Sequence, residues 1–176
     1  TSGLRVGGTF ASIGYVDTVL ENCYNTKMIS VGNSDSDFNT EVALRVGGVL
    51  ADLYRATSTK PGYTFKAAYC SNSGNIDAHV TTTSIIHIGG VVGTLCDDRG
   101  IAMVLEDIEN SGSVTVSGAS SSGKLYVGGV VGWCVNSIQI RRSHNTASGN
   151  VTVNVDTKTG DELTAGGLFG YNRHQY

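Results

Sequence analysis

Short runs of alternating apolar and polar residues recur along the chain. A period of two puts apolar side chains on one face of a β-strand and polar ones on the other. The first run, Leu4–Gly8, ends in a glycine pair, and matching runs begin at Leu44, Ile86, Leu125 and Leu163. The first glycines lie at 7, 47, 89, 128 and 166, so the spacings are 40, 42, 39 and 38 residues. This regularity predicts an all-β chain made of one repeating unit.

A second motif, an Asn followed by Ser or Thr and in most copies by a nearby Gly, lies between the glycine pairs. Its asparagines are Asn25, Asn72, Asn110 and Asn145. Asn and Gly tolerate the left-handed backbone of a tight turn. A β-branched run follows each copy, so we expect a turn and then a strand. Residues 16–19 and 101–108 could hold a helical turn, although neither has a convincing cap.

Strands at a fixed period, each apolar on one side, favour a β-solenoid in which stacked repeats bury the apolar faces. Forty residues at about 3.3 Å each trace roughly 130 Å, which is long for one turn. We therefore predict two coils of about twenty residues per repeat, and a rod of about nine rungs and 40 Å. An antiparallel sandwich or propeller is the alternative. The expected inward ladders are Leu44 with Val46, Ile86 with Ile88, Leu125 with Val127, and Val114 with Val116.

The repeats divide the whole chain, 1–176, into one repeat domain. Their approximate bounds are 4–43, 44–85, 86–124 and 125–162, with a partial repeat at 163–176. Because Thr1 is not an initiator Met and the last motif is cut short, we interpret the sequence as an excerpt of a longer chain or as a processed product.

Composition excludes several classes of protein. Hydrophobic residues make up 40% of the 176, too many for a disordered chain. The 24 glycines lack the every-third-residue spacing of collagen. The sequence has no apolar stretch of about 18 residues that would span a membrane. A net charge of −3 offers no general electrostatic case for binding nucleic acid.

The segments Gly90–Gly93, Gly129–Gly132 and Gly167–Gly170 resemble the GLUG motif of bacterial surface proteins. In that family a Gly-Gly-hydrophobic-x-Gly element is followed by Asn-Ser/Thr-Gly and a Val-rich strand. The third glycine is replaced by Ala11 and Ala51 in the first two repeats, which the resemblance would make edge-like or looser. The resemblance implies a right-handed parallel β-helix of a secreted or cell-wall protein, and it transfers no catalytic residue.

One ladder of outward positions is a candidate binding surface. It consists of Arg5, Arg45, His87, Tyr126 and Thr164. Equivalent residues of a solenoid line up, so these side chains would form a cationic and aromatic strip able to bind a glycan or an acidic partner. The alternative is an ordinary solvated strand face.

The four cysteines are predicted to be free thiols. Cys23 and Cys70 precede their turn asparagines by two residues, where later repeats have Ile108 and Ser143. Cys96 and Cys134 are nearly equivalent as well. With two coils per repeat, equivalent cysteines would lie about 9.6 Å apart, beyond the roughly 7 Å limit for a disulfide.

Metal-binding and catalytic patterns are sparse, and no cofactor is implied. Asp35, Asp37 and Asn39 have the spacing of a calcium loop, but Thr40 stands where that loop needs Gly, which favours a plain polar loop. No CxxC pair supports zinc. No column of Asp or Glu repeats, and pairing Asp77 with Thr115 as a catalytic site is speculative.

The expected function is therefore a non-catalytic stalk or adhesive segment of an extracellular bacterial surface protein. Its partners would be a glycan or a host or cell-surface protein, and it would neither bind nucleic acid nor span a membrane. One alternative is a polysaccharide lyase or hydrolase of β-helix type. The other is a filament subunit that self-associates through uncapped ends.

Overall fold

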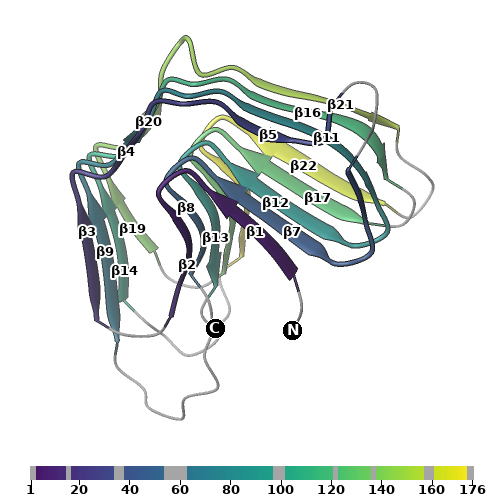
Figure 1. Ribbon diagram of the computed structural model, residues 1–176. Coiled ribbons are helices and arrows are strands. Elements are labelled where there is room, and N and C mark those ends of the chain that lie inside the picture. Colours follow the sequence, from purple (N-terminus) through teal and green to yellow (C-terminus); the bar gives the residue numbers. More distant parts are fainter. Residues whose placement is uncertain are drawn as a thin grey trace.

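The computed structural model describes residues 3–14, 17–33, 38–53, 63–96, 102–120, 123–135, 138–156 and 161–173. Within these ranges the regular structure consists of β-strands, and every strand pairing is parallel. Each strand pairs with its counterparts one repeat earlier and later, so the repeats stack as a β-solenoid (Figure 1). The predicted fold class is confirmed, and the sandwich and propeller alternatives are not.

Five sheets run along the solenoid, numbered here in the order in which one turn visits them. The first contains β1 (Gly3–Gly7), β7 (Ala43–Gly47), β12 (Ile85–Gly89), β17 (Lys124–Gly128) and β22 (Glu162–Gly166). The second contains β2 (Phe10–Ile13), β8 (Leu50–Leu53), β13 (Val92–Cys96), β18 (Val131–Val135) and β23 (Phe169–Arg173).

The third sheet contains β3 (Thr18–Glu21), β9 (Thr64–Ala68), β14 (Ala102–Glu106) and β19 (Ile138–Arg141). The fourth contains the two-residue strands β4 (Tyr24–Asn25), β10 (Ser71–Asn72), β15 (Glu109–Asn110) and β20 (His144–Asn145). The fifth contains β5 (Ile29–Val31), β11 (Ile76–Thr82), β16 (Val114–Ser120) and β21 (Val151–Asp156), with β6 (Phe38–Thr40) also paired to β11.

Each repeat forms one turn, so the prediction of two coils per repeat is wrong. Leu4 pairs directly with Leu44, which pairs directly with Ile86. Five short strands with bends between them use up the forty residues in a single circuit. The solenoid has four turns and the first two strands of a fifth, about 19 Å along its axis instead of about 40 Å.

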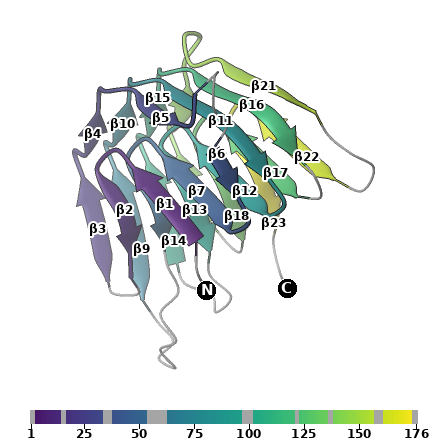
Figure 2. The ribbon, with the colours of Figure 1, turned by 45° about the vertical axis from the view of Figure 1, so that its right-hand side comes forward.

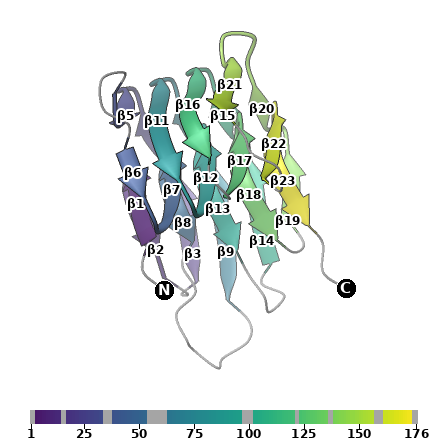
Figure 3. The same cartoon turned by 90° about the vertical axis from the view of Figure 1, so that its right-hand side faces the viewer.

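The path of one turn is bent, as the view along the axis shows (Figure 1). From its N-terminal end, which faces the viewer, the chain runs clockwise as it recedes, so the solenoid is right-handed. The turned views show the strands of each sheet side by side, with the N-terminal turn on one edge and the C-terminal turn on the other (Figures 2 and 3).

The bend divides the interior into two apolar cores. One core lies between the second and third sheets and includes Leu50, Phe65 and Leu95. The other lies between the first and fifth sheets and includes Val46, Ile88 and Val116. All eight residues predicted to point inward are at most 3% exposed. The alternation of the sequence therefore identified the core correctly.

The third sheet occupies the segments in which a helical turn was considered. Residues 18–21 and 102–106 are strands β3 and β14, because their backbone groups pair with neighbouring turns. The bend into the fourth sheet is made by a residue with positive φ in each turn. These residues are Asn22, Tyr69, Asp107 and Arg142.

The two sequence motifs meet in space at the inner corner of each turn. A Cβ on Gly89 would overlap the carbonyl oxygen of Val92, so the chain can turn this sharply only at glycine. A Cβ on Gly90 would overlap the carbonyl oxygen of Gly129 and lie 2.5 Å from the amide carbon of Asn110. The glycine pair thus leaves room for the turn asparagine. Ala51, expected to loosen the second repeat, is fully buried.

Candidate functional site

We call the sharp bend at each glycine pair, between the first and second sheets, the glycine corner. Two columns of side chains, one from each of these sheets, contact each other on the side of this corner away from the two cores; we call them the paired columns. The first-sheet column is Arg5, Arg45, His87, Tyr126 and Thr164. The second-sheet column is Ser12, Asp52, Thr94, Trp133 and Tyr171. Both point away from the two cores, and the sharp glycine turn brings them together.

The N-terminal end of the paired columns is charged. Arg5 Nε donates to Asp52 Oδ2 at 2.6 Å, and Arg45 Nε lies 3.6 Å from Asp52 Oδ1. The Asp52 side chain is 4% exposed, whereas the two arginine side chains are about one-fifth exposed. One buried carboxylate therefore neutralises part of the charge of two guanidinium groups on neighbouring turns.

His87 occupies the middle of the paired columns and is 5% exposed. Its Nδ1 is 2.8 Å from Thr94 Oγ1, and its ring stacks on Trp133 with centroids 4.8 Å apart. Its Nε2 is buried without a hydrogen-bond partner. Burial lowers the pKa of His87 to about 3, and the positive charge of Arg45 acts in the same direction. The imidazole is therefore neutral at physiological pH.

The C-terminal end of the paired columns is aromatic. The rings of Tyr126 and Tyr171 have centroids 4.9 Å apart, and Tyr126 also lies 5.4 Å from His87. Burial raises the pKa of the Tyr126 phenol above its usual range, and a hydrogen bond with Glu162 adds to the shift. The character of the columns thus changes along the axis from charged to aromatic.

The predicted ladder of Arg5, Arg45, His87 and Tyr126 does line up in register, but it is not an open strip. Tyr126 is 4% exposed, and the arginines are held by Asp52. The solvated-face alternative fails for the same reason. Sequence reasoning missed the second column because its residues share no chemical type, and only the glycine turn brings it opposite the first.

A ladder of asparagine side chains ties the turns together at the other side of the glycine corner. Nδ2 of Asn25, Asn72 and Asn110 each donates to Oδ1 of the asparagine in the next turn, at 2.7, 2.9 and 2.8 Å. Each of these amides also donates to the backbone carbonyl two residues later. Since Asn72 and Asn110 are fully buried, these bonds satisfy groups that water cannot reach.

An open pocket of about 370 Å³ lies where this ladder ends. It is lined by Asn145 and the Gly166–Gly167 pair, among others. Asn145 Nδ2 donates to the Gly149 carbonyl oxygen, and no next-turn asparagine accepts from it within the described residues. In earlier turns the second glycine of the pair packs on the turn asparagine of the same repeat, as Gly90 does on Asn110. Among the described residues Gly167 has no such neighbour, so the pocket lies where an asparagine side chain lies in the other turns.

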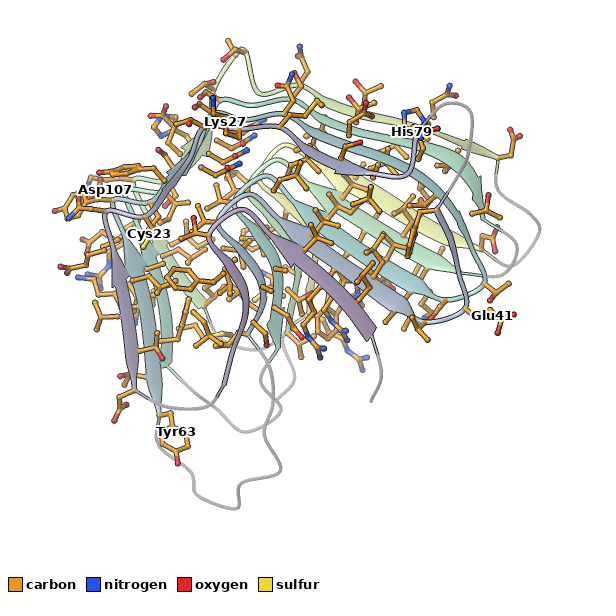
Figure 4. The ribbon with its side chains drawn as sticks, viewed as in Figure 1. Cys23, Lys27, Glu41, Tyr63, His79 and Asp107 are labelled. Carbon is orange, nitrogen blue, oxygen red and sulfur yellow. The ribbon has the colours of Figure 1, made fainter. Side chains whose placement is uncertain are left out.

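The outer face of the fifth sheet carries a Ser, His and Asp group. Ser117 Oγ is 2.6 Å from His79 Nδ1, and His79 Nε2 is 3.4 Å from Asp77 Oδ1. Asp77 and His79 are two apart on β11, and Ser117 on β16 is the direct parallel partner of His79. Figure 4 labels His79 in this sheet. Thr115 pairs with Asp77, so these two are neighbours as well. Sequence reasoning missed this group because Ser117 lies 38 residues from His79.

The other candidate sites gain no ligand set. Asp35 and Asp37 of the calcium-like pattern lie outside the described residues, as does the side chain of Asn39. Across the described ranges, no three His, Cys, Asp or Glu side chains are grouped so as to hold a metal ion. The same ranges contain no helix with the length and apolar character to cross a bilayer.

Cys23 and Cys70 are free thiols, as predicted. The distance argument behind that prediction is wrong, because Cys23 and Cys70 lie on adjacent turns. Cys96 pairs with Val135, so it is one residue out of register with Cys134.

Comparison with protein-family models, with curated proteins and with solved structures gives no match. The resemblance to the GLUG motif therefore stays a prediction from the sequence.

Proposed function

We propose that the chain is a non-catalytic stalk segment of an extracellular bacterial surface protein. The observation that carries the proposal is the continuous ladder of bonds along the axis: five parallel sheets, with buried asparagines joined turn to turn at 2.7 to 2.9 Å. Axial hydrogen bonds in every sheet resist bending and shear together, which is what a spacer needs. The extracellular location is proposed from the resemblance to the GLUG motif.

The paired columns favour a stalk over an adhesive surface. Arg5 and Arg45 both form ion pairs with buried Asp52, and the most buried aromatic ring of the columns, that of Tyr126, is only 4% exposed. Adhesion to a glycan or a cell-surface protein is the other role within this proposal. It would use the half-buried rings of Trp133 and Tyr171, and a glycan-array signal lost in Trp133→Ala would favour it.

Pulling the chain from its two ends in a force spectrometer tests the stalk proposal. Turns of about 40 residues should unzip one after another, each adding about 140 Å of contour length. The Asn110→Ala variant should unzip at lower force, because it loses a rung of the asparagine ladder; the exposed Asn154→Ala variant is the matched control. Smooth extension with no discrete steps would contradict the proposal.

The hydrolase alternative has one observation in its favour, the Ser117, His79 and Asp77 group. A nucleophilic serine also needs N–H donors for the developing oxyanion. The strands around Ser117 are paired on both sides, by β11 and β21, so their backbone N–H groups are engaged in the sheet. We expect no labelling of Ser117 by a fluorophosphonate probe, and labelling abolished by His79→Ala would establish the alternative.

Self-association through the edges is the remaining alternative. The two described edges do not match: β22 and β23 extend one turn beyond β19, β20 and β21, while β1 to β5 form one continuous turn. A second copy stacked on β22 would leave a one-strand gap in three sheets. Sedimentation velocity of this chain over a hundredfold range of concentration decides between the roles: a monomer throughout favours the stalk, and growing oligomers favour the filament.

A further inference from the structure

Cys23 and Cys70 occupy the same position in the first and second turns. Each immediately precedes a strand of the fourth sheet, and the following residues, Tyr24 and Ser71, are direct parallel partners. The backbone N–H of Ser71 donates to the carbonyl oxygen of Cys23 at 3.0 Å. The two Cα atoms are therefore one strand spacing apart, about 4.8 Å, which lies within the 4.4–6.8 Å range of disulfides.

The two thiols have the same orientation on adjacent turns, since each donates to the backbone carbonyl two residues earlier. Cys23 Sγ donates to the carbonyl oxygen of Glu21 at 3.5 Å, and Cys70 Sγ donates to the carbonyl oxygen of Ala68 at 3.3 Å. Cys70 Sγ also donates to the carbonyl oxygen of Leu20 in the preceding turn at 3.7 Å. Burial raises the pKa of the Cys70 thiol, and the neighbouring Cys23 side chain adds to this shift. Figure 4 shows Cys23 at the bend between β3 and β4.

From this geometry we propose that Cys23 and Cys70 are an oxidisable pair that joins the first turn to the second through a disulfide. The proposal does not depend on the stalk role. Closing the bond requires the side chains to rotate about their Cα–Cβ bonds, away from the carbonyl oxygens to which the thiols now donate. Ile108 and Ser143 continue the column, so no thiol of a later turn extends the pair.

The difference in exposure sets the order of the chemistry. Cys23 is half-buried and Cys70 is 1% exposed, so Cys23 meets an external disulfide first. The Cys23 thiolate attacks oxidised glutathione, forming a mixed disulfide and releasing one glutathione thiolate. Cys70 then gives up its proton and attacks Cys23 Sγ, releasing the second glutathione. Two thiols are thus oxidised to one disulfide, and one oxidised glutathione is reduced to two thiols.

The pair joins two turns that are buried to different degrees. Leu4 and Val6 in the first turn are only partly buried, whereas their partners Leu44 and Val46 are fully buried. Within the described residues the first turn therefore has less apolar contact than the second. A link from Cys23 to Cys70 closes a loop that contains most of the path between these turns, and it limits the unfolded states of both.

Oxidation of the purified chain with oxidised glutathione at pH 8.5 tests the proposal. The remaining thiols are counted by alkylation in denaturant and intact mass. Burial raises the pKa of the Cys70 thiol to about 11, so the second step should accelerate as pH rises. Of the 4 cysteines, two should lose reactivity in the native sequence. Cys134→Ala should likewise lose two thiols, and Cys23→Ala should lose none.

The stability of the oxidised protein gives a second readout. Its melting temperature should rise by on the order of 10 °C, and reduction should reverse the rise. Cys23→Ala should melt like the reduced protein, which shows that the substitution leaves the fold intact. The proposal is overturned if all four thiols stay reactive, if Cys23→Ala loses the same number of thiols, or if the disulfide joins two molecules.

Discussion

Lowering the pH should destabilise the protein through one buried side chain, His87. The folded state keeps this imidazole neutral, with a pKa of about 3, while the unfolded chain has the ordinary value of 6.5. Below pH 6.5 the unfolded state therefore binds a proton that the folded state does not. Stability is complete above about pH 6.5 and falls progressively as the pH approaches 3.

The size of this effect follows from the two pKa values. Between pH 7.5 and pH 5, the difference in proton binding removes about 2 kcal/mol of unfolding free energy, and by pH 4 about 3 kcal/mol. For a chain of this length, about 2 kcal/mol lowers the melting temperature by roughly 4–8 °C. The cause is the environment of the ring: burial among Trp133, Tyr126 and Thr94, and the positive charge of Arg45.

The assay is urea unfolding at pH 7.5 and pH 5, for the native sequence and for His87→Gln. Glutamine does not titrate, and its amide can still bond to Thr94. His79 and His144 are present in both proteins, so their contributions cancel in the comparison. We expect the native protein to lose about 2 kcal/mol more than the variant. Equal losses in the two proteins would refute the account of His87.

Three further substitutions test the interior. Asn110→Ala should cost about 2–4 kcal/mol, since it removes the bond that Asn110 accepts from buried Asn72 and the two that it donates, to Asn145 and to the Gly112 carbonyl oxygen. Exposed Asn154→Ala, expected within about 0.5 kcal/mol, is the control, and equal urea midpoints would count against the ladder. Val127→Asp buries an unpaired charge and should cost more than about 4 kcal/mol, so an unchanged thermal melt would contradict the inward assignment. Asp52→Asn should cost roughly 2 kcal/mol, because the arginines it holds are partly exposed; a cost that vanishes in high salt would instead indicate a solvated pair.

Much of the core could be predicted from the alternation of residues. Leu44, Ile86 and Leu125 were expected to stack, and they are buried in register. The third sheet was not predicted, because its strands, such as Thr18–Glu21 and Ala102–Glu106, share no sequence motif by which they could be aligned. Their strands form because a neighbouring turn supplies backbone partners at that level.

The candidate sites were less accessible to sequence reasoning. The column of Arg5, Arg45 and His87 was found because it is periodic, but its burial depends on a second column that shows no periodic pattern. Likewise, Cys23 and Cys70 were recognised as equivalent, while their separation depends on how many coils one repeat makes.

By itself the sequence determined the repeat, the strand faces and the residues that stack, since these follow from local periodicity and from the small side chains required at sharp turns. Only the tertiary structure decided that forty residues close a single turn, since the closing of a turn depends on the angles of five bends added together. That closure in turn decided which side chains face one another across the glycine corner and between adjacent turns.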